Sequence, residues 1–133
     1  MTFLFDTSAL VAHALRQEGV EQVQSAMDQE AAGLLASALS LFELAGVLQR
    51  EGCGRQVPEF WRIYSAGLEI IPVTADLAQA AWGLRESTGQ RLPLADAIIA
   101  ATARSRGATL VHRDRHLAAI PDSVVPQIRL PAT

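Results

Sequence analysis

The sequence predicts an α/β fold with a mainly parallel sheet, and three observations lead to that prediction. Short runs of apolar or β-branched residues alternate along the chain with longer segments of helical periodicity. That alternation is typical of parallel strands joined by helical crossovers. The chain has 133 residues, half of them hydrophobic, which suits one compact domain over residues 1–133. No repeat, low-complexity tract or linker interrupts it.

The chain begins with a predicted strand and two predicted helices. Thr2–Phe5 is a continuous apolar run of strand length and is expected to be buried. Thr7 or Ser8 can cap a first helix that continues to about Arg16, before a glutamate–glycine pair breaks the pattern. Val20–Glu30 is expected to form the second helix, because its valines and methionine recur on one face.

The middle of the chain continues the alternation. Gly33–Ala36 is predicted to be a short strand, and Ala38–Arg50 a helix that ends before a glycine–cysteine–glycine sequence. Val57–Ser65 is predicted to be a helix, with Pro58 near its start, where proline is tolerated. Leu68–Val73 is a β-branched run and is predicted to be the third strand.

The last part of the chain adds two long helices and two strands. Thr74 can cap a helix over Ala75–Ser87. Pro93–Arg106 is predicted to be a helix, with Gly107 at the position after the C-cap where glycine is favoured. The remaining predicted elements are a strand, a short helical turn and a last strand: Ala108–Val111, His116–Ile120 and Val125–Leu130.

Composition limits the setting in which the protein is expected to act. No apolar run approaches the length of about 20 residues that spans a membrane, and the N-terminus lacks a secretory signal pattern. The single cysteine, Cys53, cannot form an internal disulfide. We therefore expect a cytoplasmic protein. The two tryptophans, Trp61 and Trp82, fall in amphipathic helices and are expected in the core.

The charged residues exclude several kinds of chemistry. The net charge is −3, so any nucleic-acid contact would need a local basic patch. All eleven basic residues are arginines. The absence of lysine excludes a phosphate-binding loop lysine and a Schiff base, whereas arginine is well suited to contact phosphates.

Four acids lie where acids are rare, beside or inside apolar segments: Asp6, Glu43, Asp96 and Asp114. An unpaired buried carboxylate costs several kcal/mol, so four of them indicate a shared purpose. Several follow or begin elements that can converge on one edge of a parallel sheet, where ligands commonly bind. Mg²⁺ and Mn²⁺ prefer oxygen ligands and can activate water for phosphodiester hydrolysis. The sequence thus predicts a metal site in which these acids are both ligands and catalytic residues.

Each acid also has a structural explanation. Asp6 and Asp114 could cap helices, and Asp96 lies in the first turn of a helix, where the dipole stabilises it. Glu43 is harder to explain, because its neighbours one turn away are largely apolar. It could still lie at the border of the stripe or pair with Arg50.

Basic and titratable residues surround the fourth acid. Arg113, Arg115 and His116 could contact the phosphates of a substrate, and the alternative is a solvated loop.

These residues carry a resemblance to a known family. The chain resembles PIN-domain ribonucleases, most closely VapC-type toxins of bacterial toxin–antitoxin pairs. The resemblance covers nearly the whole chain and rests on four segments in the family's order: Phe3–Leu10, Leu41–Leu44, Leu92–Ala101 and Leu110–Asp114.

The resemblance implies a three-layer sandwich with a five-stranded sheet and an endoribonuclease that uses Mg²⁺ or Mn²⁺ held by the four acids. It also implies that Ser8 contacts the substrate, water or an acid, and that the chain forms a homodimer blocked by a cognate antitoxin. Single-stranded or looped RNA is the expected substrate, and tRNA is one candidate. Two departures stand out: His116 replaces a further acid found in many relatives, and the fourth strand ends in His112-Arg113.

Two other functions remain open from the sequence. A phosphotransfer domain could use Asp6 as a covalent acceptor, but such domains need a lysine and this chain has none. A non-catalytic protein-binding module could retain the fold, although the intact set of acids argues against it.

Overall fold

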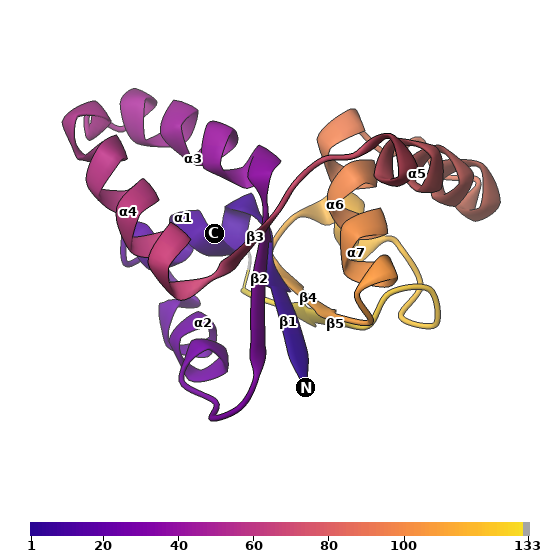
Figure 1. The fold of residues 1–133 in the computed structure, drawn as a ribbon, viewed down its shortest axis with the longest axis horizontal. Coiled ribbons are helices and arrows are strands. Elements are labelled where there is room, and N and C mark those ends of the chain that lie inside the picture. The colour runs from indigo at the N-terminus through magenta and orange to yellow at the C-terminus, as the bar shows by residue number, and fades with distance from the viewer. Residues whose placement is uncertain (132–133) are drawn as a thin grey trace.

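A five-stranded, entirely parallel sheet runs through the middle of the molecule (Figure 1). The computed structural model describes residues 1–131, so the predicted domain end at Thr133 lies outside the described residues. The strand order is β3-β2-β1-β4-β5, which puts the N-terminal strand at the centre. The strands are β1 (Thr2–Phe5), β2 (Gly33–Ser37), β3 (Glu69–Ile71), β4 (Thr109–His112) and β5 (Gln127–Arg129).

Helices cover both faces of the sheet, so the predicted three-layer α/β sandwich is confirmed (Figure 1). Helices α1 (Thr7–Ala14), α2 (Val20–Met27), α3 (Ala38–Arg50) and α4 (Val57–Gly67) lie on one side, with a 3₁₀ turn at Gly54–Gln56. Helices α5 (Ala75–Thr88), α6 (Leu94–Ser105) and α7 (Arg115–Ala118) lie on the other. None of the helices within residues 1–131 has both the length and the hydropathy that a membrane crossing needs.

Two separate cores form because successive side chains of β1 point to opposite faces of the sheet. Phe3 and Phe5 point to the face covered by α1–α4, whereas Leu4 packs with α5, α6 and α7 on the other. All three are buried, and burying such a side chain contributes about 1.5–3 kcal/mol. A continuous apolar run is therefore required at the central strand, because each successive side chain enters a core.

Several predicted boundaries were wrong, each for a local reason. Helix α1 is capped by Asp6, not by Thr7 or Ser8, and it ends at Ala14 because Arg16 adopts a left-handed conformation (φ 53°). Helix α2 stops at Met27 rather than Glu30. Strands β3 and β5 are shorter than predicted because Pro72 and Pro126, which flank them, have no N–H to donate to a neighbouring strand.

Two further differences concern a turn and the tryptophans. The 3₁₀ turn at Gly54–Gln56 was not predicted, and α7 begins at Arg115 and ends at Ala118 rather than spanning His116–Ile120. The prediction that Trp61 and Trp82 are core residues was wrong, because they are 40% and 59% exposed. Trp61 instead covers the surface of α3, where its indole N–H donates to the Leu41 carbonyl (2.8 Å).

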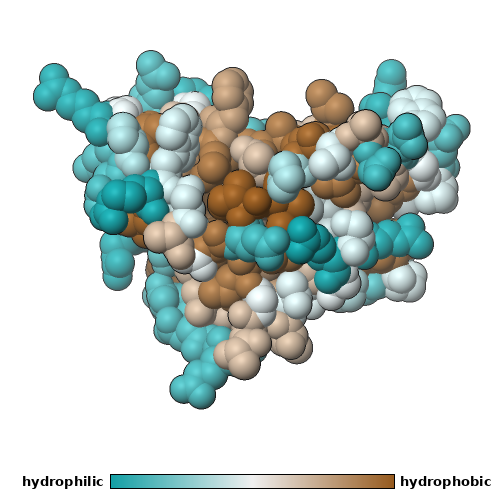
Figure 2. Space-filling view, in the orientation of Figure 1, coloured by the Kyte–Doolittle hydropathy of each residue, from teal (hydrophilic) through white to brown (hydrophobic). Residues whose placement is uncertain are grey.

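Figure 2 shows apolar side chains gathered in the middle of one face of the molecule, between hydrophilic ends.

Candidate active site

The four acids that the sequence singled out line one cavity of about 280 Å³. Asp6 directly follows β1, and its N–H donates to the Val111 carbonyl of the adjacent β4 (3.1 Å). Asp114 lies two residues beyond β4. Glu43 enters from α3 and Asp96 from the first turn of α6, which belong to opposite helical layers. The predicted convergence at the carboxyl edge of the sheet is therefore present in the fold.

Asp6 uses one carboxylate oxygen for structure and leaves the other for a ligand. Its Oδ1 accepts hydrogen bonds from the Ser8 hydroxyl (2.6 Å) and the Ala9 N–H (3.1 Å). The side chain is almost fully buried, yet Oδ2 accepts no hydrogen bond from residues 1–131. Every fully buried side-chain oxygen in that range has a hydrogen-bond partner, so Oδ2, which has none, is not fully buried. It opens into the cavity that Asp6 lines.

Burial raises the pKa of Asp6 to about 7, and hydrogen bonds from Ser8 and Ala9 oppose that rise. The nearby charges of Asp114 and Asp96 add to it. The pKa of Asp96 is raised to about 6, first by burial and then by the charge of Asp114. Two carboxyl groups with raised pKa values in one cavity are typical of a functional site.

Glu43 is held by a contact between two neighbouring helices, α1 and α3. Its Oε1 accepts a hydrogen bond from the Thr7 hydroxyl (2.6 Å), whose oxygen also lies 3.1 Å from Ser40 Oγ. A hydroxyl carries one proton, so when Thr7 donates to Glu43 the buried Ser40 must donate to Thr7. No ion pair joins Glu43 to Arg50 within the described part of the chain, so that alternative is not realised.

Asp114 caps α7 and also lies close to Asp96. Its Oδ1 accepts from the N–H groups of His116 (2.7 Å) and Leu117 (3.2 Å). His116 Nδ1 lies 3.6 Å from Asp96 Oδ2 and 3.5 Å from Asp114 Oδ1. Each of the three side chains offers a possible ligand atom, and these atoms lie within 4.8 Å of one another.

Ser8 and Arg113 connect the ends of the two central strands. The Ser8 hydroxyl donates to Asp6 and accepts from the Arg113 N–H (2.9 Å), so its protein contacts orient Asp6. The Arg113 side chain lines the cavity and donates to the side chain of Gln17 and the carbonyl of Glu18. Arg115 is exposed. Phosphate or substrate contacts by Ser8, Arg113, Arg115 and His116 stay predictions.

Two residues near the acids have roles that the sequence did not reveal. Thr7 was expected to cap a helix, but it holds Glu43 instead. His112 is fully buried, and its Nδ1 accepts from the Asp114 N–H (3.0 Å) while its Nε2 lies 2.7 Å from Gln127 Oε1. Burial lowers the pKa of His112. In the sequence, the only sign of either role is that Thr7 follows Asp6 and that His112 lies two residues before Asp114.

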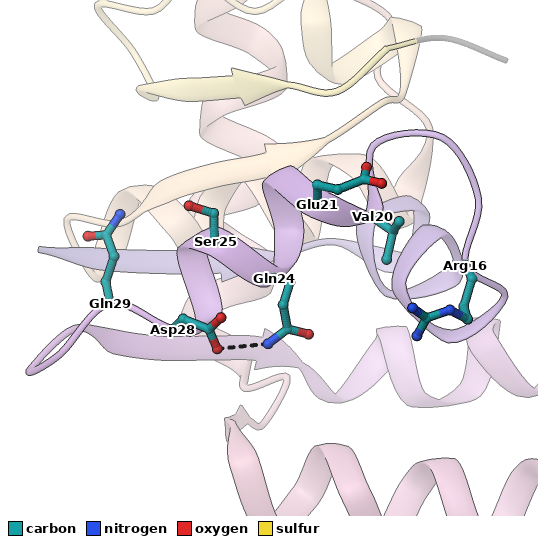
Figure 3. Close-up of a pocket in the computed structure, with 7 residues that line it drawn as sticks. All are labelled: Arg16, Val20, Glu21, Gln24, Ser25, Asp28 and Gln29. Carbon is teal, nitrogen blue, oxygen red and sulfur yellow. Dashed lines mark hydrogen bonds between the residues drawn. The ribbon is translucent and has the colours of Figure 1, made fainter.

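A larger cavity of about 500 Å³ lies along α2 and shares no lining residue with the acid cavity (Figure 3). Six of its seven lining residues are polar or charged, and two of them are hydrogen-bonded to each other, because the Gln24 amide donates to Asp28 (2.8 Å; Figure 3). It does not bring the predicted site residues together.

The acid cavity fits a hard divalent cation. Asp6, Glu43 and Asp114 each use one oxygen to accept hydrogen bonds, and among residues 1–131 none of these bonds reaches the second oxygen. Both oxygens of Asp96 are likewise without a hydrogen bond from these residues. Mg²⁺ and Mn²⁺ prefer such carboxylate oxygens together with water.

Comparisons with known proteins identify the family and support the fold. The PIN domain family matches residues 3–123. VapBC2 from Rickettsia felis, bound to promoter DNA, has a TM-score of 0.76 at 20% identity, covering 98% of this chain and 100% of that chain. A toxin–antitoxin complex from Klebsiella pneumoniae has a TM-score of 0.69 at 25% identity, covering 90% and 92%. VapC20 from Mycobacterium tuberculosis, a toxin that cleaves the sarcin–ricin loop, has a TM-score of 0.72 at 22% identity, covering 88% and 93%. The search of curated proteins found no match.

Proposed function

The chain belongs to the PIN-domain family, and on that premise we propose that it is a Mg²⁺- or Mn²⁺-dependent endoribonuclease of the VapC toxin type. One observation carries the proposal: four acids from β1, α3, α6 and the end of β4 line a single cavity and keep carboxylate oxygens available. Such a set can hold a cation and receive the proton of an attacking water, without a covalent nucleophile.

The residues divide the task between binding and orientation. Asp6, Glu43, Asp96 and Asp114 hold the cation. When bound, Mg²⁺ or Mn²⁺ lowers the pKa of water and offsets the negative charge that develops on the phosphodiester. Ser8 orients Asp6 and Thr7 orients Glu43 through their hydroxyl groups. Arg113 and Arg115 neutralise substrate phosphates, and His116, whose ring lies near Asp96 and Asp114, contacts the substrate beside them.

The substrate and partners follow from the same proposal. We expect single-stranded or looped RNA, with tRNA as one candidate, because unpaired strands expose the phosphates and bases that a duplex hides. The similarity to VapBC and other toxin–antitoxin complexes supports a cognate antitoxin as a protein partner. A homodimer and a cytoplasmic location belong to the proposal as well.

Cleavage of RNA by purified protein tests the proposal. Wild-type protein should cut total RNA when Mg²⁺ or Mn²⁺ is present and should stop when EDTA is added. Asp6→Asn and Asp96→Asn should lose most of the activity, while Asp76→Asn, an exposed acid on α5, should retain it. Equal cleavage by wild type, Asp6→Asn and Asp96→Asn would overturn the proposal.

Growth of cells that express the protein separates the enzyme from a non-catalytic binding module. An enzyme predicts toxicity that disappears with Glu43→Gln, because that change removes a ligand charge but keeps the side-chain shape. Toxicity that persists with Glu43→Gln would favour the binding module.

A further inference from the structure

We propose that His116 is a nitrogen ligand of the cation site, and that it makes the site prefer a first-row transition ion such as Mn²⁺ over Mg²⁺. The inference rests on the proposed function for the existence of the cation site, and goes beyond it in assigning a mixed ligand set of Asp96, Asp114 and His116.

The separation of the three side chains carries the assignment. His116 Nδ1 lies 3.5 Å from Asp114 Oδ1 and 3.6 Å from Asp96 Oδ2, which is too long for a hydrogen bond to either aspartate. Two ligand atoms that share one ion, each bonded to it at about 2.1 Å, lie roughly 3.0–3.4 Å apart. The distance from His116 to Asp96 is close to that spacing, and one ligand atom from each of the three side chains lies within 4.8 Å of the other two, so small side-chain movements would let all three groups bind one cation.

His116 is also distinguished from the other histidines by its available nitrogens. Both ring nitrogens of His112 are engaged, by the Asp114 N–H and by Gln127. Both ring nitrogens of His13 are engaged too, by Tyr64 and Gln24. Neither ring nitrogen of His116 has a hydrogen bond to residues 1–131, which leaves one free to bind an ion.

The local fold holds the His116 backbone while leaving its ring accessible. Asp114 accepts from the backbone N–H groups of His116 and Leu117, and the fully buried Leu117 fixes α7 against the core. The His116 side chain remains 43% exposed, so a cation from solvent can reach it.

An independent observation points to a cation at the same place. Asp6 is only 3% exposed, and its Oδ2, which has no hydrogen-bond partner among residues 1–131, opens into the cavity that Asp96 and Asp114 also line. A carboxylate oxygen that has no protein donor and faces a cavity is available there to bind a hard cation. His116 therefore lies beside a cavity whose carboxylates are already expected to bind a cation.

Ligand chemistry gives the expected selectivity. Mg²⁺ binds oxygen ligands and keeps several waters, so a nitrogen ligand adds little to its affinity. Imidazole is a better ligand for first-row transition ions, whose affinities for nitrogen-containing sites rise from Mn²⁺ through Co²⁺ and Ni²⁺. An imidazole nitrogen from His116 in the ligand set should thus shift the preference of the site away from Mg²⁺.

Pulsed electron paramagnetic resonance of bound Mn²⁺ gives a direct readout that needs no RNA. Wild-type protein should show modulation from a directly bound imidazole ¹⁴N, which changes to the ¹⁵N pattern when the protein carries ¹⁵N-labelled histidine. His116→Ala should lose this signal. His13→Gln is the matched control, because it removes a histidine whose nitrogens contact Tyr64 and Gln24 instead, and it should keep the signal.

Calorimetric titration with Mn²⁺ and Mg²⁺ measures the selectivity. His116→Ala should weaken Mn²⁺ binding about tenfold or more and change Mg²⁺ binding less. His116→Asp should restore the preference for Mg²⁺, and circular dichroism shows whether each variant is folded. Bound Mn²⁺ without a histidine nitrogen signal, or affinities for Mn²⁺ and Mg²⁺ that His116→Ala changes by the same factor or leaves unchanged, would overturn the inference and leave the nuclease proposal standing. Failure of wild-type protein to bind either ion would instead refute the metal dependence in the proposed function, and this inference with it.

Discussion

At the scale of single residues, helix capping and ligand binding share the same carboxylates. Asp6 caps α1 and Asp114 caps α7, and each does so through Oδ1 alone. The second oxygen of each remains available, so the structural explanation of these acids does not compete with the functional one. Each cap bond also limits rotation of its carboxylate, which orients the second oxygen for a ligand.

The hydroxyl of Thr7 should matter for catalysis because it orients Glu43. Thr7→Val keeps the shape of the side chain but removes the hydrogen bond to Glu43 Oε1. We expect kcat for RNA cleavage to fall about 10- to 100-fold, with a smaller change in KM, because loss of an orienting contact to a metal ligand has effects of that size.

Thr7→Ser is the matched control, since it retains the hydroxyl and should recover most of the rate. Initial rates on a labelled RNA at saturating Mn²⁺, with the melting temperature of each variant, provide the measurement. A Thr7→Val enzyme as active as Thr7→Ser would show that this hydrogen bond does not orient a catalytic group.

At the scale of secondary structure, the ends of elements decide where the site residues lie. Helix α6 carries Asp96 in its first turn and ends in a glycine-terminated cap. The Ala108 N–H donates to the Ala103 carbonyl (2.9 Å) and the Gly107 N–H to the Arg104 carbonyl (3.2 Å), while Gly107 has φ +59°. This cap turns the chain directly from α6 into β4, whose end supplies Asp114.

Alanine at Gly107 and at Gly83 should change stability in opposite directions. A Cβ at either position meets no atom within 4 Å, so crowding contributes to neither change. Gly107→Ala should reduce the free energy of unfolding by about 1 kcal/mol, because alanine disfavours the left-handed conformation. Gly83→Ala, inside α5, should increase it by about 0.5–1 kcal/mol, because alanine is the better helix former. Urea unfolding of both variants measures the difference, and changes of the same sign would refute this explanation.

At the scale of the whole molecule, the two cores bring like charges together. Packing α1–α4 and α5–α7 on opposite faces of one sheet places four acids around a small cavity. The hydrophobic burial in both cores must therefore offset the unfavourable burial of charge at the carboxyl edge. A bound cation would offset the repulsion among the four carboxylates and so stabilise the folded protein. Metal binding is therefore linked to folding stability.

The stability of metal-free protein should fall as pH rises from about 4 to about 7. The folded-state pKa of Asp6 is raised from 3.8 to about 7, so between these values the folded protein binds more protons than the unfolded chain. Stability contributed by the protonated form is present below pH 3.8 and is lost as pH rises through the folded pKa. The loss can reach about 4 kcal/mol from Asp6 alone, and Asp96 changes stability in the same direction.

Urea unfolding in EDTA at pH 5 and pH 8 measures this dependence. Asp6→Asn should flatten it and Asp76→Asn should not. Adding Mn²⁺ at pH 8 should restore stability, by about 2.7 kcal/mol at a concentration 100 times the dissociation constant. A pH dependence that is unchanged in Asp6→Asn would rule out Asp6 as its source.

The sequence by itself determined the α/β class, most of the strands and helices, the cap at Gly107 and the four acids. These features depend on local signals, namely periodicity, turn-forming residues and acids beside apolar runs, which act over a few positions of the chain. Only the tertiary structure decided that Thr7 holds Glu43, 36 residues away, that His116 lies beside Asp96, and that the tryptophans are exposed. Those outcomes depend on how α1 packs beside α3 and α6 beside α7, and local periodicity carries no information about the distance between side chains on different elements.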